Sequence, residues 1–132
     1  MFLLDANVIL EFLLDQEKAD DVGAFLRKTP FEELGISDFA LHSIGIILFR
    51  ERKFDVLREA FDDFFVRGES RLLSLAYEDI DEVARAGQEF NLDFDDAYQY
   101  ACAEKYDLTI VSFDSDFDRT PRGRKTPAEL LK

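Results

Sequence analysis

The stretch FLLDANVIL, residues 2–10, joins two apolar segments through the carboxylate of Asp5. The pattern predicts a short buried strand over Phe2–Asp5 that passes directly into a helix over Ala6–Leu14. An unpaired charge at such a junction costs free energy when it is buried. Asp5 therefore either caps the helix or lies next to a cation, and this stretch alone leaves both possibilities open.

The composition is typical of one globular domain, which we expect to span residues 1–132. The chain is 47% hydrophobic and 34% charged, so it can bury one core and is too apolar to be disordered. No apolar stretch approaches the ~20 residues that a membrane span needs, and no basic segment precedes the first apolar run. Together with the single cysteine, Cys102, these features indicate a cytoplasmic protein in a reducing compartment.

The formal net charge is −13. This charge argues against tight binding of nucleic acid, because phosphate backbones attract lysine and arginine. It is compatible with binding of cations or of a basic partner. The local placement of charged residues therefore matters more than their sum.

Short apolar segments alternate with helical patterns along the whole chain. The predicted strands are Phe2–Asp5, Leu34–Ser37, Arg71–Leu75 and Leu108–Phe113. The predicted helices are Ala6–Leu14, Lys18–Lys28, Phe39–Phe49, Phe54–Val66, Glu78–Glu89, Phe94–Tyr106 and a terminal turn at Thr126–Leu131. This alternation predicts a doubly wound α/β domain, in which helices cover both faces of a parallel sheet. Ligands of such sheets bind at the carboxyl ends of the strands, where the strand order reverses.

Acidic residues from three separate segments fall at this predicted edge. Asp5 ends the first strand, and Asp114 and Asp116 follow the last strand in VSFDSDF (111–117). Asp95 and Asp96 open the helix in LDFDDAYQYACAEKYDL (92–108). Hard divalent cations such as Mg²⁺ and Mn²⁺ bind oxygen ligands, and they can polarise a phosphoryl oxygen and activate water. A cluster of repelling carboxylates is therefore a candidate metal site.

Each of these acids also has a purely structural interpretation. Asp5 can be a helix N-cap, and Asp96 can be an acid in a first helical turn that Asp93 caps. Asp114 and Asp116 can shape an Asx turn. It is their joint placement at one edge that favours a functional site.

The segments LLDANVIL, DFDDAYQYACA and LTIVSFDSDFDR, in this order and spacing, resemble the PIN domain (PilT N-terminus) family. The resemblance covers nearly the whole chain and is closest to the small VapC-type toxins of toxin–antitoxin pairs. It implies a three-layer PIN-like fold with a parallel central sheet, and a metal-dependent endoribonuclease with an acidic pocket. It further implies RNA as substrate, a small antitoxin as a possible partner, and a homodimer.

The resemblance also assigns site residues. Asp5, Asp96 and Asp114 match the catalytic acids, and together with Asp116 they would bind Mg²⁺ or Mn²⁺. Asn7 and Ser112 match polar positions that hold these ligands in place. The metal would then activate a water molecule for attack on an RNA phosphodiester.

One position departs from the family pattern. The family usually carries a Glu on the helix after the second strand, and here Ser43 occupies that position, where it would support the site without a carboxylate. Asp38 and His42 share a helix face, so His42 either points toward the site or is a partly buried structural histidine, and we favour the latter. The missing Glu also supports an alternative function: a degenerate PIN-fold module that binds RNA or protein without cleavage.

Two further stretches have open interpretations. The helix FALHSIGIILF (39–49) is apolar around nearly its whole circumference, so it is either core or a subunit interface, and the resemblance favours a homodimer. The basic stretch DRTPRGRKT (118–126) is either a solvated loop or a phosphate contact made by Arg119, Arg122 and Arg124. A phosphoacceptor receiver domain is disfavoured, because Arg71–Leu75 lacks the required Asp and Leu108–Phe113 lacks the required Lys.

Overall fold

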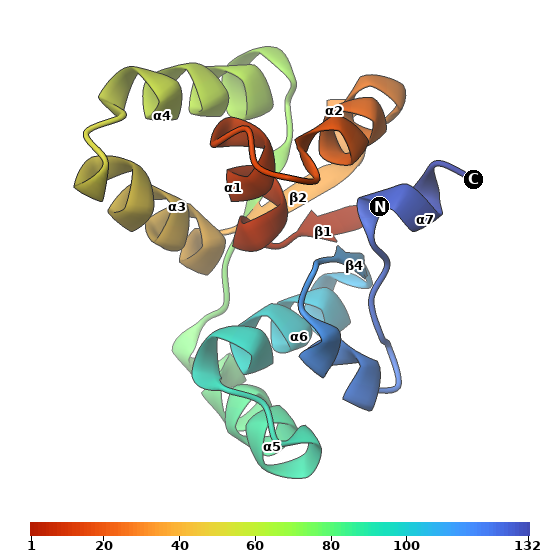
Figure 1. Ribbon diagram of the computed structural model, residues 1–132. Helices are drawn as coiled ribbons and strands as arrows, with labels where there is room; N and C mark the ends of the chain where they lie inside the picture. Colours follow the sequence, from red (N-terminus) through yellow and green to blue (C-terminus); the bar gives the residue numbers. More distant parts are fainter.

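Four short parallel strands form one sheet at the centre of the molecule (Figure 1). The structure is a computed structural model that describes residues 1–132. The strand order is β3-β2-β1-β4, and every neighbouring pair is parallel. The strands are β1 (Phe2–Leu4), β2 (Leu34–Ser37), β3 (Arg71–Leu73) and β4 (Thr109–Val111). The chain moves outward from β1 to β3 and returns to place β4 on the other side of β1, so the strand order reverses between β1 and β4.

Helices cover both faces of the sheet, which confirms the predicted three-layer α/β architecture. They are α1 (Ala6–Leu13), α2 (Ala19–Lys28), α3 (Asp38–Arg50), α4 (Phe54–Phe61), α5 (Ile80–Phe90), α6 (Phe94–Tyr106) and α7 (Pro127–Leu130). Successive strand residues point to opposite faces, as the pleat requires. Leu3 and Ile110 pack with α5 and α6, whereas Leu4 and Val111 pack with α1, α2 and α3. None of the helices has the length and apolar character needed to span a bilayer.

Most predicted boundaries differ from the structure by one or two residues, and two of the differences have a clear structural basis. The third strand ends at Leu73 instead of Leu75. Beyond Leu73, backbone groups bond to tyrosine side chains and not to the neighbouring strand. The Leu75 N–H donates to the Tyr98 hydroxyl at 3.1 Å, and the Tyr106 hydroxyl donates to the carbonyl of Ser74 at 2.8 Å. The helix predicted over Phe54–Val66 is α4 followed by a π-helical segment, Asp62–Arg67.

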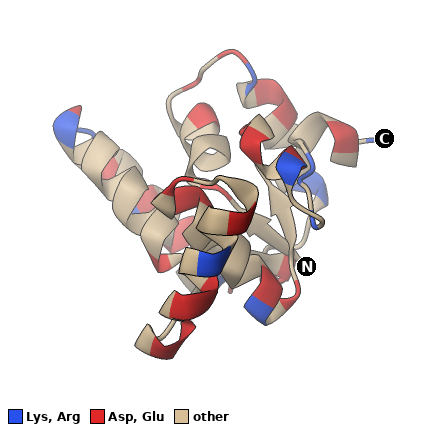
Figure 2. Cartoon of the chain, turned by 90° about the horizontal axis from the view of Figure 1, so that it is seen from below, with Lys and Arg blue, Asp and Glu red and all other residues tan.

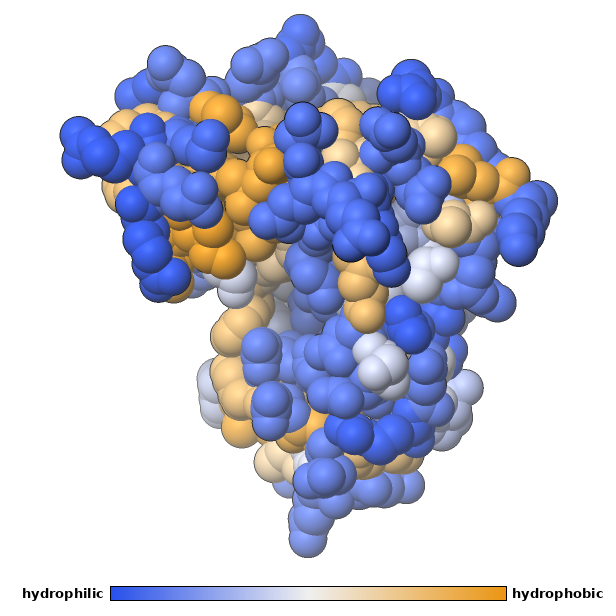
Figure 3. All heavy atoms as spheres, in the orientation of Figure 1, coloured by the Kyte–Doolittle hydropathy of each residue, from blue (hydrophilic) through white to orange (hydrophobic).

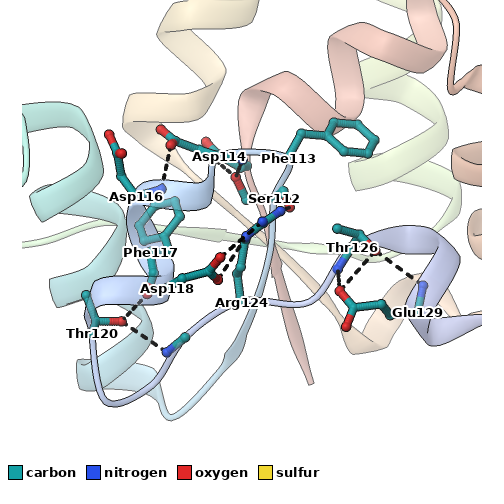
Figure 4. Close-up of polar contacts among 12 residues, drawn as sticks. Ser112, Phe113, Asp114, Asp116, Phe117, Asp118, Thr120, Arg124, Thr126 and Glu129 are labelled. Atoms are coloured by element: carbon teal, nitrogen blue, oxygen red, sulfur yellow. Dashed lines mark hydrogen bonds and ion pairs between the residues drawn. The ribbon is translucent and has the colours of Figure 1, made fainter.

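The C-terminal segment returns to the edge of the sheet beside β4. The Lys125 N–H donates to the Ile110 carbonyl at 2.8 Å, and the Lys125 carbonyl accepts from the Ser112 N–H at 3.0 Å. Thr126 and Glu129 then form a capping box that starts α7 (Figure 4). The Lys28 ammonium donates to the carbonyl of Leu130 at 2.6 Å, which attaches α7 to α2.

Helix α3 has one buried and one exposed apolar face. Ala40, Ile44 and Leu48 are buried in the core, whereas Ile46 and Phe49 are 58% and 59% exposed. The exposed face forms a groove of about 590 Å³ with α4, and apolar surface is visible over these helices at the upper left of Figure 3. This groove, the α3–α4 groove, is lined by Leu41, His42, Gly45, Ile46, Phe49, Leu57 and Phe61.

Candidate active site

An acidic pocket lies at the carboxyl ends of β1 and β4, where the strand order reverses. Its volume is about 240 Å³. Such reversal points are the usual binding position in open parallel sheets. Polar side chains from four segments line it: Asp5, Asn7, Ser43, Asp95, Asp96, Gln99 and Asp114. Asp5, Asp96 and Asp114 are therefore in one pocket although they come from distant parts of the sequence.

Asp5 both caps a helix and faces the pocket. Its Oδ1 accepts from the Ala6 N–H at 2.9 Å at the start of α1, so the predicted N-cap is present. Oδ1 also accepts from the Gln99 amide at 3.3 Å, and Oδ2 accepts from the Ser112 hydroxyl at 2.7 Å. Burial nevertheless raises the pKa of the Asp5 carboxyl above its usual range, against the opposing effect of these hydrogen bonds.

Ser112 connects the two strand ends. Its hydroxyl donates to Asp5 and accepts from the Asn7 amide at 3.3 Å and from the Asp114 N–H at 2.9 Å. The Asn7 carbonyl oxygen accepts from the Phe113 N–H at 3.2 Å. Asn7 therefore acts on Asp5 through Ser112 and not by direct contact, and both residues fix the β4 loop against the start of α1.

Three carboxylates form a cluster, of which Asp96 and Asp114 line the pocket and Asp116 lies beside it. Asp96, Asp114 and Asp116 each offer an oxygen atom, and these atoms lie within 4.8 Å of one another. Asp114 shapes the loop as expected, because its side chain accepts from the Asp116 N–H at 2.9 Å (Figure 4). Asp93 occupies the N-cap position of α6 but makes no side-chain cap bond. The structural interpretation of Asp96, which depended on that cap, therefore does not account for its buried position.

Repulsion within this cluster is visible in the acidity of Asp96. Burial, followed by hydrogen bonding to Asp114 and repulsion from Asp114, Asp5 and Asp95, raises the pKa of Asp96 to about 8. The cluster therefore holds a proton on Asp96 near neutral pH when no cation is bound.

The donor set fits a hard divalent cation. All three clustered groups are carboxylates, which Mg²⁺ and Mn²⁺ prefer, and no histidine or cysteine lines the pocket. Asp5 shares the pocket but is outside the group of three oxygens, so its place in a metal site stays a prediction. A cation would offset the burial and the repulsion that together retain the proton on Asp96.

Ser43 and His42 leave α3 in different directions. Ser43 lines the acidic pocket, so the position where the family usually has Glu faces the carboxylates. His42 is exposed and lines the α3–α4 groove. Our expectation of a partly buried His42 was wrong, since the exposed face of α3 carries it away from both the core and the pocket.

The three arginines of the basic stretch bind the protein itself. Arg119 donates to the carbonyls of Phe90 and Asn91, and Arg122 donates to the carbonyl of Leu108. Arg124 donates to the carbonyl of Ser112 and pairs with Asp118 (Figure 4). None of the three lines the acidic pocket. The loop is therefore held against the domain by its arginines, and phosphate contact by these side chains stays a prediction.

The structure adds residues that the sequence patterns did not identify. Gln99 is 2% exposed and receives a hydrogen bond of 2.5 Å from the Ser37 hydroxyl, while its amide donates to Asp5. It lies three residues after Asp96 and therefore on the same face of α6, which is the signal that could have found it. Phe39, the second residue of α3, forms part of the pocket wall.

Solved structures with a similar fold include a toxin–antitoxin complex and a toxin. A Klebsiella pneumoniae toxin–antitoxin complex matches with TM-score 0.77 and 18% identity over 98% of this chain and 99% of that chain. FitAB bound to the IR36 DNA fragment matches with TM-score 0.80 and 21% identity over 97% and 96%. VapC20 of Mycobacterium tuberculosis, a sarcin–ricin loop cleaving toxin, matches with TM-score 0.74 and 15% identity over 89% and 93%.

The fold and the position of the pocket agree with a family-level match of the sequence. No curated protein sequence matched the chain. The family model described as PIN domain matches residues 2–123, which includes every strand and every acid of the pocket. The chain thus belongs to the PIN domain family.

Proposed function

We propose that this PIN-domain protein is a metal-dependent endoribonuclease of the VapC toxin type. The observation that carries the proposal is the group of three carboxylates within 4.8 Å at the reversal point of the sheet. Membership in the PIN family and the similar fold of a sarcin–ricin loop cleaving toxin support it. The substrate would be RNA, with a phosphodiester placed at the carboxylate cluster.

The proposed roles follow from the contacts in the pocket. Asp96, Asp114 and Asp116 would hold Mg²⁺ or Mn²⁺, and Asp5 would complete the site from the end of the neighbouring strand β1. When bound, such an ion polarises a phosphoryl oxygen and makes water a stronger nucleophile. Ser112, Asn7 and Gln99 are positioning residues, because they fix the Asp5 carboxylate and the loop that carries Asp114. Arg119, whose side chain is 45% exposed, is the arginine that best reaches a phosphate.

We further propose that the chain pairs with an antitoxin protein, since one structure of similar fold is a toxin–antitoxin complex. The α3–α4 groove offers an apolar surface for a protein partner, and the homodimer expected from the sequence would use it. One alternative function has an observation in its favour. Ser43 faces the pocket without a carboxylate, which favours a module that binds RNA or protein and does not cleave.

The decisive experiment combines metal binding with RNA cleavage. Mn²⁺ titration calorimetry and a panel of single-stranded RNAs, with and without chelator, would compare wild type with Asp96→Asn and Asp114→Asn. Asp93→Asn is the matched control: it removes the same charge from an exposed residue of the same helix start that makes no cap bond. We expect both pocket variants to lose more than roughly 100-fold in metal affinity and cleavage, beyond what outer-shell changes cause.

The control should keep both properties. Equal Mn²⁺ affinity in wild type and the pocket variants would contradict the site. Metal binding or RNA binding without cleavage of any RNA in wild type would favour the non-cleaving module.

A further inference from the structure

Three aromatic rings form one wall beside the acidic pocket. Phe39 lines the pocket, and its ring centroid lies 5.8 Å from that of Phe94 and 5.5 Å from that of Tyr98. Phe94 and Tyr98 are 6.1 Å apart. These spacings are those of packed aromatic pairs, so the three rings make a continuous cluster, which we call the aromatic wall.

One ring of the aromatic wall, Tyr98, is buried and fixed, and another, Phe94, is exposed. Tyr98 is 9% exposed, and its hydroxyl donates to Asp38 at 2.8 Å and accepts from the Leu75 N–H at 3.1 Å. Phe94, in contrast, is 58% exposed. Because the Phe94 ring is exposed and packs against a fixed ring, a flat ligand that stacks on it would cost little side-chain entropy.

The aromatic wall continues directly into the carboxylate cluster. Phe94 begins α6 and is followed by Asp95 and Asp96, both of which line the pocket. Residues two apart on a helix point to different sides, so Phe94 adjoins the pocket through Phe39, whose side chain lines the pocket and whose ring packs on Phe94. A base that adjoins a phosphodiester in the pocket would therefore meet Phe39 first and Phe94 beyond it.

Electrostatic attraction cannot supply the affinity for such a ligand. The net charge is −13, and the arginines that follow the pocket in sequence are bound to backbone carbonyls and to Asp116, Asp118, Glu104 and Asp107. A polyanion that approaches the carboxylate cluster needs attraction of another kind. Stacking on aromatic side chains meets this need, because every base has a π-face and the interaction does not depend on charge.

We infer that Phe39 and Phe94 form a stacking site for an unpaired base next to the phosphodiester that the acidic pocket receives. The ligand class is single-stranded nucleic acid with at least one splayed base. The inference rests on the proposed function for the position of the phosphate. Base-paired substrate would be a poor ligand, since its bases are stacked on one another and unavailable.

The test is a fluorescence titration with a short single-stranded RNA that carries 2-aminopurine, whose emission falls when it stacks. Titrations at low salt are done with EDTA and repeated with Mg²⁺. The variants are Phe94→Leu, which keeps the apolar character and removes the π-face, and Phe94→Trp, which keeps a π-face. Phe12→Leu is the matched control, because Phe12 is 41% exposed and lines neither the acidic pocket nor the α3–α4 groove.

We expect Phe94→Leu to bind roughly 5- to 100-fold more weakly, the range that loss of one stacked base covers, and to lose most of the quenching. Phe94→Trp and Phe12→Leu should bind like wild type. An RNA of equal length with abasic sites should bind wild type as weakly as intact RNA binds Phe94→Leu. The slope of affinity against salt should not change in Phe94→Leu, because no phosphate contact is removed.

The outcomes separate this inference from the proposed function. If wild type and Phe94→Leu cleave RNA equally and quench equally, the stacking site is wrong and the nuclease stands. If quenching depends on Phe94 but wild type cleaves no RNA with Mg²⁺ or Mn²⁺, the stacking site stands and the nuclease is wrong. If wild type neither quenches nor distinguishes abasic RNA, the stacking site is overturned. A Phe94→Leu variant that changes only its sedimentation, with RNA binding unchanged, also overturns it and identifies Phe94 as a protein contact.

Discussion

At the scale of single residues, the acids of the pocket combine structural and chemical roles. Asp5 caps α1 and faces the pocket with the same carboxylate, so the capping interpretation is confirmed, while a cation next to Asp5 stays a prediction. Asp114 likewise shapes its loop and joins the carboxylate cluster. Asp96 differs, because its carboxylate caps no helix and is buried among other acids. Its protonation should therefore report directly on the electrostatics of the cluster.

The acidity of Asp96 predicts a pH dependence of stability in the metal-free protein. The folded pKa is about 8 and the ordinary value is 3.8, so the folded state keeps a proton that the unfolded state loses between these values. The free energy of unfolding should therefore fall as pH rises through this window and level off above about pH 8. Thermal melting in EDTA from pH 5 to pH 9 would measure this. Asp96→Asn, a neutral side chain of the same shape, should show a weaker fall.

Asp93→Asn is the control for this comparison, since it removes an exposed acid at the start of the same helix. Its melting curves should follow those of wild type across the pH range. If Asp96→Asn and wild type instead gave parallel curves, the proton would not reside on Asp96.

At the scale of elements, α3 carries the position that decides between cleavage and mere binding. Ser43 lines the pocket, and Ile47, one turn further along, lines it as well. Ser43→Glu would therefore direct a carboxylate toward Asp96 and Asp114. We expect Mn²⁺ affinity to rise on the order of tenfold, the lower end of what changes around a metal produce, with a parallel gain in ribonuclease activity.

His42→Glu is the matched comparison for Ser43→Glu, because it adds the same charge to the exposed side of the helix. It should leave metal affinity unchanged. Calorimetry with both variants would refute the role of Ser43 if they behaved alike, or if Ser43→Glu weakened binding while the fold was retained.

The elements were largely predictable from the sequence, and the contacts between them were not. Apolar segments such as Leu108–Phe113 and turn residues locate strands and helices, and the alternation fixes a covered parallel sheet. Periodicity does not give the strand order, and only the pairing of β1 with β4 brings Asp5 to Asp114. Gln99 was missed because nearly every residue around it on α6 is buried. The helix therefore has no separate polar face from which a pocket position could be predicted. Arg119 and Arg124 each pair with a nearby aspartate, but both also donate to backbone carbonyls, which leave no trace in a sequence.

At the scale of the whole molecule, charge and apolar surface act in opposite directions. Acidic residues occur on elements throughout the chain (Figure 2), and copies that each carry −13 repel one another. The α3–α4 groove nevertheless exposes a large apolar surface. Association through this groove should therefore strengthen when salt screens the repulsion, whereas nucleic-acid binding through phosphates weakens with salt.

Sedimentation at low and moderate salt would test the proposed homodimer. We expect wild type to approach twice its monomer mass of 15.3 kDa as salt is added, and Ile46→Glu to stay monomeric because a charge in the groove opposes apolar contact. Val66→Glu is the control, since Val66 is 71% exposed and does not line the groove. A wild type that is monomeric at every salt concentration would contradict the homodimer and leave the groove to another protein.

The return of the chain at Lys125 also affects how the molecule behaves in concentrated solution. An uncovered strand with free N–H and C=O groups is a template on which other chains can add strands and aggregate. Lys125 occupies these groups at β4, whereas the opposite margin of the sheet is only the three residues of β3, where Arg71 adds a charge. The residues around Lys125, most of which lie beyond the residues 2–123 that the family model matches, thus prevent other chains from pairing with the edge of β4. A fusion or truncation that displaced Lys125 would leave the edge of β4 unpaired without changing the pocket.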